Sequence, residues 1–360
     1  MPSPPLRNLW PHLTSFTSLH AAALQAQRGK RYRPAVLAFN ARLEANLFRL
    51  QEELCSFTYR PGPYRQFEIR DHNRLLISAD PYRDRVVHHA LCATIAPPLE
   101  RGFLPTTFAN RRGFGSHKAL RRFVAECGSH RWVFSADIRL YFPSIDLTIL
   151  RQQLAERISC PDTLWLLDQI LANGASHGPA LDAFPGDTLL TPLERSRGLP
   201  IGNLTSQFLA NFHLNAIDHR LAALPGIGAY LRYVDDMVLF ANSPEPLRQA
   251  LLCLETELAA LRLRLHPIKS QIRQTRHGVS FVGFRALPKR VRVRNHNLLN
   301  GKRRLRRQQQ AVVSGALDSE AARASLQSWN AHLAHGHTWR LRQRLFADVP
   351  FATALLTQSR

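Results

Sequence analysis

The chain has few cysteines and no long apolar run, and both shortages narrow the range of functions. It contains 5 cysteines among 360 residues, and no two of them form a CxxC pair. This spacing excludes the familiar zinc-finger patterns, and we expect free, buried thiols in a reducing compartment rather than a disulfide framework. No segment approaches the roughly 18 consecutive apolar residues that a membrane span needs, and the first residues carry no signal-peptide pattern. These features predict a cytoplasmic protein.

Acidic residues are scarce relative to basic ones. There are 26 Asp and Glu against 48 Lys and Arg, which gives a formal net charge of +22 and an isoelectric point of about 11.1. A positive field of this size attracts polyanions, and phosphate neutralisation with counterion release then supplies binding energy. A basic protein without a nucleic-acid partner is the alternative. Arginine outnumbers lysine heavily, and because guanidinium groups match phosphate oxygens in pairs, this bias favours nucleic acid as the partner.

The apolar periodicity predicts helices alternating with short strands. We expect helices over residues 35–54, 86–95, from 117 onward, 147–158, 164–171, 204–221 and 247–263. We expect extended segments over 65–69, 75–77, 132–138, 230–234, 237–240 and 279–284. Pro97 and Pro98 should close the helix that precedes them. Residues 173–198 are rich in Gly, Pro and Ser, so we interpret them as an irregular insertion, more plausibly a tolerated loop than a partner contact. The mixture predicts an α+β fold.

Three aspartates carry the chemical signal. Asp235 and Asp236 separate two short apolar runs, which is typical of a tight hairpin. Their like charges repel each other, and a divalent cation is the natural compensation. Asp137 ends another apolar run, so all three carboxylates would meet at one sheet edge if that strand lies beside the hairpin. Such a site can hold two metal ions that activate an attacking 3′-hydroxyl and stabilise the leaving pyrophosphate. Taken singly, each aspartate would be a solvated turn or strand-end residue, but their joint appearance favours the metal site.

The motifs around these aspartates resemble those of reverse transcriptases. The sequence YVDD at 233–236 matches the YxDD motif of that family, with apolar residues on both sides. Residues 134–142 resemble the first catalytic motif, which has an aromatic residue five positions after the aspartate. Further segments resemble, in the family's order, the finger motifs, the glycine motif, the lysine motif and the primer-grip hairpin: 74–77, 108–119, 199–207, 266–269 and 281–284. The resemblance extends from about residue 60 to 290.

The resemblance implies a fold and an activity. The fold is the right-hand polymerase fold, an α+β arrangement of fingers, an antiparallel-sheet palm and a helical thumb. The implied regions are 1–130 for the N-terminal part and fingers with part of the palm, 131–289 for the palm, and 290–360 for a basic helical thumb. The implied activity is RNA-directed DNA synthesis with two Mg²⁺ ions, for which Mn²⁺ can substitute. The metal ligands would be Asp137, Asp235, Asp236 and the carbonyl of Ile138.

The resemblance also implies two sets of binding residues. The nucleotide would be bound by Arg74, Ile138, Tyr141, Phe142, Ile201, Gly202, Gln207 and Lys269. Among these, Phe142 would be the steric gate that leaves no room for a ribose 2′-hydroxyl, and Lys269 would lie near the triphosphate. Template and primer would be bound by Arg112, Tyr233, Phe281, Gly283, Arg304 and Arg307. The basic run at 302–307 is either a solvated helix face or a surface that grips the duplex backbone, and in a polymerase we favour the second.

One motif indicates a subfamily. Where much of the family has QGxxxSP, residues 201–207 read IGNLTSQ, which is similar to the reverse transcriptases of diversity-generating retroelements. Segments 81–97 and 326–335 are similar to theirs as well. That resemblance implies copying of a template RNA with errors opposite adenine, together with a small basic accessory protein. The alternatives are a phage-defence or CRISPR-associated reverse transcriptase, and a nucleic-acid-binding scaffold of a ribonucleoprotein, which would have no physical need for three converging acids.

Overall fold

The centre of the molecule is a four-stranded antiparallel sheet. The structure is a computed structural model that describes residues 4–70, 74–175, 182–288 and 290–347. The strand order in the central sheet is β4-β5-β3-β6, with a two-stranded β1-β2 hairpin and a three-stranded β7-β8-β9 sheet elsewhere. The strands are β1 Arg65–Arg70, β2 Arg74–Ala79, β3 Trp132–Asp137, β4 Ala229–Tyr233, β5 Asp236–Ala241, β6 Gln271–Gln274, β7 Val279–Phe281, β8 Phe284–Leu287 and β9 Arg290–Val293.

Helices make up most of the remainder. In chain order they are α1 Trp10–Leu13, α2 Phe16–Ala26, α3 Pro34–Asn40, α4 Leu43–Cys55, α5 Tyr82–Glu100, α6 Ser116–Ser129, α7 Tyr141–Ser144, α8 Leu147–Arg157, α9 Pro161–Gly174, α10 Thr191–Glu194, α11 Leu204–His213, α12 Asn215–Ala222, α13 Glu245–Ala260, α14 Asn295–Val313, α15 Ser319–Ala334 and α16 Trp339–Phe346. The mixture of helix and sheet agrees with the expected α+β class.

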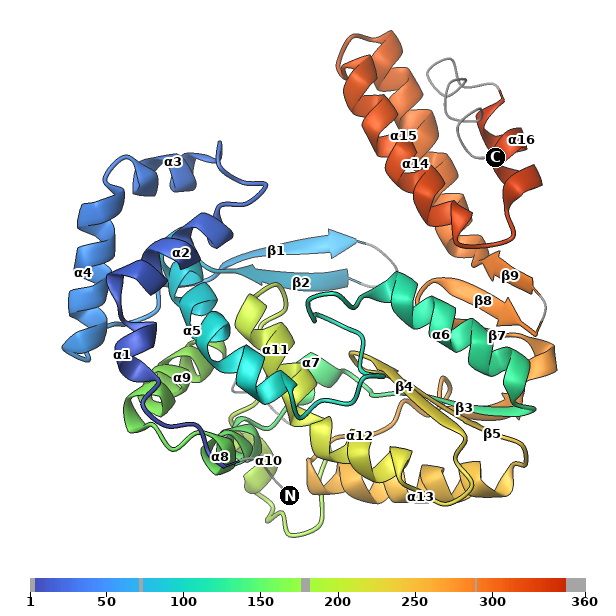
Figure 1. Cartoon of the computed structure of the whole chain (residues 1–360), viewed down its shortest axis with the longest axis horizontal. Helices are drawn as coiled ribbons and strands as arrows, with labels where there is room; N and C mark the ends of the chain where they lie inside the picture. Colours follow the sequence, from blue (N-terminus) through green and yellow to red (C-terminus); the bar gives the residue numbers. More distant parts are fainter. Residues whose placement is uncertain (1–3, 71–73, 176–181, 289, 348–360) are drawn as a thin grey trace.

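The central sheet is covered on both faces because strands β3, β4 and β5 are mainly apolar on both sides, whereas β6 at the edge is mainly polar. Helix α6 lies over one face, and α12 and α13 lie under the other (Figure 1). Side chains alternate along a strand, so neighbours in β5 join different cores. Phe240 packs with Phe123 of α6, whereas Leu239 belongs to the large core that includes Leu254 of α13. This double burial fixes which face each strand residue presents, and therefore where the strand ends lie.

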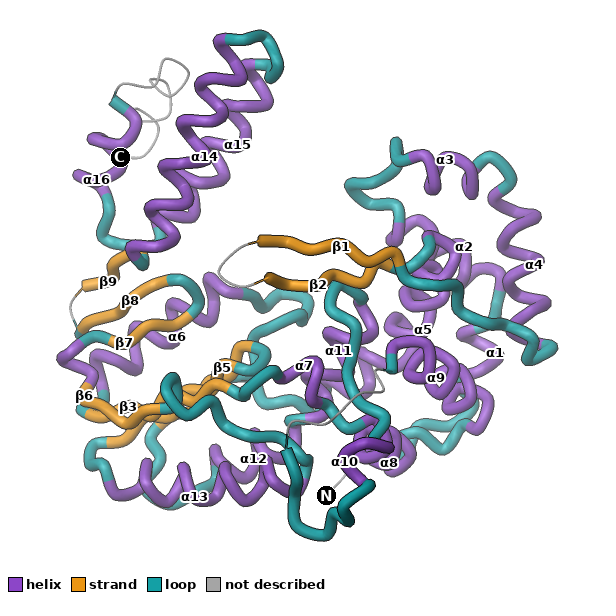
Figure 2. Tube along the Cα trace, turned by 180° about the vertical axis from the view of Figure 1, so that it is seen from behind, coloured by secondary structure: helices purple, strands orange, loops and turns teal. Residues whose placement is uncertain are grey.

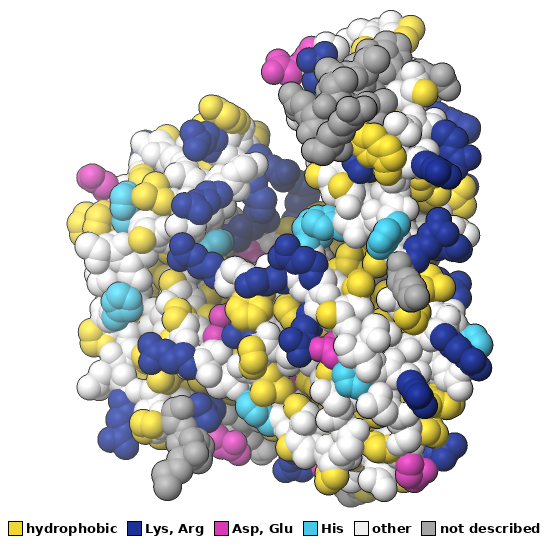
Figure 3. Space-filling view, turned by 45° about the vertical axis from the view of Figure 1, so that its right-hand side comes forward, with side chains coloured by type: hydrophobic (Ala, Val, Ile, Leu, Met, Phe, Trp, Pro, Cys, Tyr) yellow, Lys and Arg dark blue, Asp and Glu magenta, His cyan; other side chains and the backbone are white. Residues whose placement is uncertain are grey.

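Two parts rise above this sheet and leave a hollow between them. The β1-β2 hairpin and helices α1 to α4 stand on one side, and the long helices α14 and α15 project on the other (Figures 1 and 2). The β7-β8-β9 sheet connects the central region to these C-terminal helices. Lys and Arg side chains gather around the hollow (Figure 3).

Two expected helices are each broken in two. The segment 35–54 forms α3 and α4, because Arg42 between them leaves the helical conformation with φ −133° and ψ 47°. The segment 204–221 forms α11 and α12, which meet at Leu214 with ψ near 0°. In both cases one apolar periodicity spans the break, since both pieces bury residues in the same core. Periodicity alone therefore could not locate the break.

Two further expectations about element ends were wrong. Pro97 and Pro98 do not close the preceding helix but lie inside α5, which continues to Glu100. Each proline removes one helical N–H donor, but both lie in the last turn, and the helix continues for only two residues beyond them. The apolar pattern over 279–284 predicted one strand, but the structure has a hairpin with Val282 and Gly283 in its turn at positive φ. The apolar pattern is continuous there, so the turn was indicated only by the glycine and by the resemblance of 281–284 to a hairpin motif.

Two expectations from composition concerned the cysteines and membrane-spanning segments. All five cysteines are free, as expected, but Cys55 is exposed and Cys253 is half-buried rather than buried. Within the described ranges, no helix combines the length and the apolar character needed to cross a bilayer.

Candidate active site

The register of the central sheet brings two of the three aspartates face to face. Asp137, the last residue of β3, pairs with Asp236, the first residue of β5. Asp235 precedes it in the two-residue turn that joins β4 to β5, and the other turn residue is Val234. The hairpin is therefore shifted by one residue from the expectation that Asp235 and Asp236 together form its turn. The shift places the Asp236 side chain in the ladder beside Asp137.

The pKa values of Asp235 and Asp236 are raised by burial and by neighbouring carboxylates. Burial and the charges of Asp235 and Asp137 raise the pKa of Asp236 to about 7. Burial, with a contribution from Asp137, also raises the pKa of Asp235. Like charges held together in a partly buried place shift protonation equilibria in this way unless a cation balances them. The site therefore has an excess of negative charge that a cation would relieve.

One cation, Lys269, already neutralises part of this charge. Its Nζ lies 3.1 Å from Asp137 Oδ2 and 3.2 Å from Oδ1. The segment carrying the lysine is held against the end of β3 by backbone hydrogen bonds, in which His266 N donates to Asp137 O and Arg139 N donates to Arg264 O. The lysine side chain remains 57% exposed, so it can leave the carboxylate without disturbing the core.

The donor set fits a magnesium site that substrate completes. Asp137, Asp235 and Asp236 supply hard oxygen ligands, and the raised pKa values of Asp235 and Asp236 reflect a negative charge that a cation would balance. Ile138 forms an isolated bridge with Leu265 whose two hydrogen bonds are made by its neighbours, so these bonds do not use its own carbonyl. In the part of the chain that the structure describes, no three His, Cys, Asp or Glu side chains form a ready-made metal cage. Magnesium usually binds through one or two carboxylates plus substrate phosphates, so this arrangement fits it.

A cleft of about 600 Å³ opens beside these residues. Asp137, Asp236 and Lys269 line one side of it, and Phe281 and Gly283 of the β7-β8 turn line the other. The same cleft is lined by two arginines that the motifs did not identify, Arg273 of β6 and Arg294. Nothing in the local sequence distinguishes them from the many other arginines, because only the fold brings them to the carboxylates. The expected primer-grip residues Phe281 and Gly283 thus share one cavity with two of the three expected catalytic acids, Asp137 and Asp236.

The expected gate residue, Phe142, lies in the short helix that follows the Asp137 strand. Phe142 is half-buried in the short helix α7, and its carbonyl accepts a hydrogen bond from Leu199 N at 2.9 Å. Tyr141 packs edge-on against it, with 5.7 Å between ring centroids. The Tyr141 hydroxyl donates to Ala210 O at 2.5 Å, and the side chain is buried. Tyr141 therefore supports Phe142 from the core, which differs from the expected contact with the nucleotide.

The glycine motif lies against the β1-β2 hairpin. Ile201 O accepts a hydrogen bond from Ser78 N at 2.9 Å, and the Ile201 side chain is half-buried. Gly202 has φ +120°, and a Cβ there would approach Ile77 Cγ2 to 2.9 Å. Only glycine fits so close to a neighbouring strand in that conformation. Gln207 is half-buried in the first half of α11.

The remaining expected binding residues are spread around the hollow. Arg74 begins β2, and nothing further is described of its side chain. Arg112 is exposed in the loop before α6, and Tyr233 is half-buried at the end of β4. Arg304 and Arg307 are exposed on α14, whose buried residues are Gly301 and Leu305.

The insertion is tied to the active-site segments, which the sequence did not reveal. Asp182 pairs with Arg139, at 3.5 Å, and with Arg264, at 3.3 Å. Asp187 accepts two hydrogen bonds from Arg195, each of 2.6 Å. Arg139 and Arg264 flank the bridge that holds the lysine segment to β3, so the described part of the insertion lies against that bridge. Residues 176–181 lie outside the described ranges.

Comparison with known proteins agrees with the motif order. The family model described as reverse transcriptase (RNA-dependent DNA polymerase) matches residues 62–286. Protein YkfC of Escherichia coli (strain K12) is 27% identical over 293 residues, an alignment that covers 70% of this chain and 74% of YkfC. The matched region includes every strand from β1 to the larger part of β8.

Proposed function

This chain belongs to the reverse transcriptase family and is an RNA-directed DNA polymerase; from that premise we propose that it copies the template RNA of a diversity-generating retroelement, using Asp137, Asp235 and Asp236 as metal ligands. The observation that carries the catalytic assignment is the direct pairing of Asp137 with Asp236 across two strands of the central sheet. It supports a shared site because the two carboxylates cannot separate without breaking the ladder.

The chain's own residues supply binding and orientation. Asp137 and Asp235 would be the principal ligands of magnesium, with Asp236 and the Ile138 carbonyl beside them. When bound, two magnesium ions activate the 3′-hydroxyl and stabilise the departing pyrophosphate. Lys269 would exchange its contact with Asp137 for the incoming triphosphate, with Arg74 as a second cation. Because the lysine is half-exposed and joined to a single carboxylate, that exchange costs little.

The binding surfaces follow from the same geometry. Phe142 would exclude a ribose 2′-hydroxyl, and Gly202 would let the backbone approach the nucleotide. The cleft residues Phe281 and Gly283 would hold the primer end. The β1-β2 hairpin and its neighbours would be the fingers, the central sheet the palm, and helices α14 to α16 the thumb. Exposed Arg304 and Arg307 would then contact the duplex backbone without reading its sequence.

The retroelement assignment rests on the residues around Ile201. An isoleucine replaces the polar residue that most of the family has there, so one hydrogen bond near the nascent base pair is lost. Such a bond is worth on the order of 1 kcal/mol, or about a five- to tenfold change in selectivity. A small basic accessory protein would belong to the same system.

Primer extension with product sequencing tests this proposal. A mixed-sequence RNA template, magnesium and all four deoxynucleotides are used with the wild type and the Asp235→Asn, Asp236→Asn double variant. Extension by the wild type alone, with errors concentrated opposite template adenines, supports both parts of the proposal. Faithful extension overturns the retroelement part and favours a defence-type enzyme. Full activity of the double variant overturns the metal assignment.

The Ile201→Gln variant examines the physical origin of the errors. The added amide should lower errors opposite adenine by about five- to tenfold if one hydrogen bond sets selectivity. If an active variant has an unchanged error spectrum, the lost hydrogen bond at Ile201 does not cause the errors. The retroelement assignment itself would not be affected by that result.

A further inference from the structure

Arg232 is a fully buried arginine directly before the YVDD segment. It belongs to β4, where both neighbours along the strand are apolar or aromatic, and its side chain is 0% exposed. Its ion-pair partner Asp218 of α12 is also 0% exposed. Burying two charges costs several kcal/mol per ion before their attraction is counted, so such a pair is weak support for stability alone. Another role is needed to explain its place beside the catalytic turn.

All five N–H donors of the Arg232 guanidinium are used. Nε and Nη2 each donate to Asp218 at 2.7 Å, in the paired geometry that an arginine and a carboxylate form. Nη2 also donates to Asn211 O at 2.9 Å, and Nη1 donates to Asn211 Oδ1 at 3.1 Å. The fifth bond runs from Nη1 to the carbonyl of Val234, at 3.0 Å. The side chain therefore connects two helices to the turn of the catalytic hairpin.

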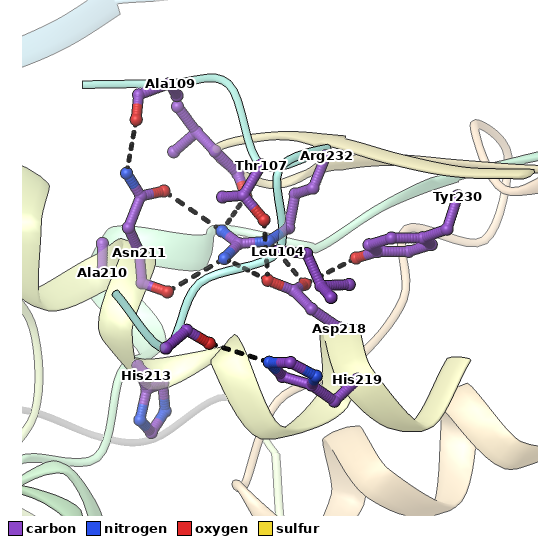
Figure 4. A network of polar contacts seen from close by, with 12 residues as sticks. Leu104, Thr107, Ala109, Ala210, Asn211, His213, Asp218, His219, Tyr230 and Arg232 are labelled. Atoms are coloured by element: carbon purple, nitrogen blue, oxygen red, sulfur yellow. Dashed lines mark hydrogen bonds and ion pairs between the residues drawn. The ribbon is translucent and has the colours of Figure 1, made fainter. Parts of the chain in front are cut away.

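The partners of Arg232 are themselves fixed (Figure 4). Asp218 accepts hydrogen bonds from the Tyr230 hydroxyl at 2.6 Å and from Thr107 Oγ1 at 3.1 Å. Asn211 Nδ2 donates to Ala109 O at 2.7 Å. The guanidinium is thus held by α11, α12 and the loop before α6, and it has no freedom to move with the hairpin.

The turn that Arg232 holds has an unfavourable backbone conformation. Val234 has φ +59°, a left-handed value that β-branched residues rarely adopt. At this position of a tight hairpin turn, glycine is the usual residue. Strain of this kind persists where several surrounding contacts hold the backbone in place. The hydrogen bond from Arg232 to the Val234 carbonyl is one such contact, and the next residue in the chain is Asp235.

We propose that Arg232 is a positioning residue that fixes the Val234–Asp235 turn, and through it the direction of the Asp235 carboxylate. Lysine could balance Asp218 but, as a point charge, could not also bond Asn211 and the Val234 carbonyl. The inference rests on the proposed role of Asp235, and the Asp235→Asn variant tests that role separately.

The test compares two variants that remove the Val234 bond in different ways. Arg232→Lys keeps a charge beside Asp218. The triple variant Arg232→Met, Asp218→Leu, Tyr230→Phe replaces the buried charges and hydroxyl with apolar groups, a change that often preserves stability. Tyr230→Phe alone is the matched control, because it removes a bond to Asp218 and leaves the Val234 bond intact. Folding is checked by thermal melting for each variant.

The expected signature is a fall in kcat of about 10- to 100-fold, the scale associated with misplacing a reacting group by about 1 Å. KM for the deoxynucleotide and Kd for an RNA template with a DNA primer should stay within about twofold, since the lost interaction does not touch either ligand. Binding of Mn²⁺ without nucleotide, followed by electron paramagnetic resonance, should weaken in the same variants. The Tyr230→Phe control should retain the wild-type kcat and Mn²⁺ affinity.

A second substitution distinguishes positioning from stability. Val234→Gly removes the strain, because glycine adopts positive φ freely. Added to Arg232→Lys, it should restore part of the lost kcat, a result that repair of stability elsewhere would not produce. Wild-type kcat in a folded Arg232→Lys or triple variant overturns the proposal. The proposal is also overturned if the loss of kcat in Arg232→Lys is unchanged when Val234→Gly is added. If the triple variant does not fold, Arg232→Lys alone decides by the same criteria. Full activity of Asp235→Asn would instead overturn the role proposed for Asp235.

Discussion

Lys269 Nζ lies 3.1 Å from Asp137 Oδ2, so the residue expected to meet the triphosphate rests on a carboxylate expected to hold metal. The two expected roles are compatible. Before substrate binds, the Lys269 ammonium takes the place of a metal cation beside Asp137, and the Asp137 carboxylate takes the place of a phosphate beside Lys269. Without nucleotide, the ammonium partly balances the three acids. On the proposed roles, the phosphates of a bound nucleotide would give the ammonium a stronger partner, and Asp137 would then be available to a metal ion. The contact therefore describes a resting state of the site.

Loss of this ammonium should weaken catalysis on the deoxynucleotide. We expect Lys269→Met to lower kcat/KM by about 10- to 100-fold, because a hydrogen bond to a charged group is worth about 1.5–3 kcal/mol. Single-nucleotide addition under steady-state conditions measures it. Lys30→Met, at an exposed N-terminal position, is the control and should match the wild type. An equal loss in both variants would point to net charge rather than a specific contact.

The buried Asp146 should contribute strongly to stability. Its carboxylate is 1% exposed, caps α8 through Thr148 N and Ile149 N, and accepts from Arg262 at 2.7 Å. Asp146→Ala should lower the free energy of unfolding by about 2–3 kcal/mol, since it removes the cap of α8 and the closest carboxylate of Arg262, which is 31% exposed. Urea denaturation measures this change. Asp168→Ala, which breaks an ion pair with a half-exposed carboxylate, should cost less than about 1 kcal/mol.

The pair of Asp80 and His88 should make stability depend on pH. Burial raises the pKa of Asp80 to about 7, and burial lowers the pKa of His88 to about 4, with 3.7 Å between His88 Nε2 and Asp80 Oδ1. Arg85 opposes the Asp80 shift and Asp84 adds to it. Between pH 3.8 and about 7 the folded protein retains the Asp80 proton that the unfolded chain has lost. The Asp80 contribution to stability therefore falls as pH rises through this window.

The Asp80→Asn variant should cancel that fall. Because an amide resembles the protonated acid, the variant should equal the wild type near pH 4 and exceed it by on the order of 1–3 kcal/mol at pH 8. The His88 contribution has the opposite sign, rising from about pH 4 to 6.5, and is common to both proteins. Denaturation midpoints over this range measure the difference. Equal slopes for Asp80→Asn and wild type would contradict the assignment.

The exposed arginines of α14 should contribute to binding of the duplex. Arg304→Glu with Arg307→Glu should weaken binding of an RNA–DNA duplex and reduce the slope of log K against log salt by about 1 to 2, because each phosphate contact adds about 0.7–0.9 to that slope. Fluorescence anisotropy at several salt concentrations measures both quantities. Arg248→Glu on α13, beneath the central sheet, is the control. Identical salt slopes for the variant and the control would indicate a solvated helix face instead.

The sequence predicted the features that depend on a few neighbouring residues. It did not predict the features that depend on contacts between residues far apart in the chain. The hairpin at 229–241 and the strand before Asp137 were predictable, because apolar runs and turn residues alternate there over a few residues. The breaks at Arg42 and Leu214 were not, since one hydrophobic stripe crosses each break without interruption. Pro97 and Pro98 were misplaced by a few residues, because a proline does not fix the helix end at its own position and α5 continues to Glu100.

The candidate site divides in the same way. The carboxylates, the glycine and the lysine belong to motifs that can be read from the chain, whereas Arg273 and Arg294 reach the cleft only through strand pairing and the β7-β8-β9 sheet. The sequence contains one signal for Arg232, because an arginine within an apolar strand is buried only where polar side chains or carbonyls can bind it. Those partners, Asp218 and Asn211, are 14 and 21 residues away, so no local pattern could name them.

The alignment of β3 with β5 has a consequence for how the enzyme can fail. Side chains alternate along a strand, so a slip of one residue would turn Asp137 to the opposite face and also exchange Phe134 and Val133 between two separate cores. A molecule paired out of step would therefore lose its catalysis and the packing of both cores together. The same register thus serves as a structural check, since a chain that assembles the two cores correctly has also assembled the carboxylate pair.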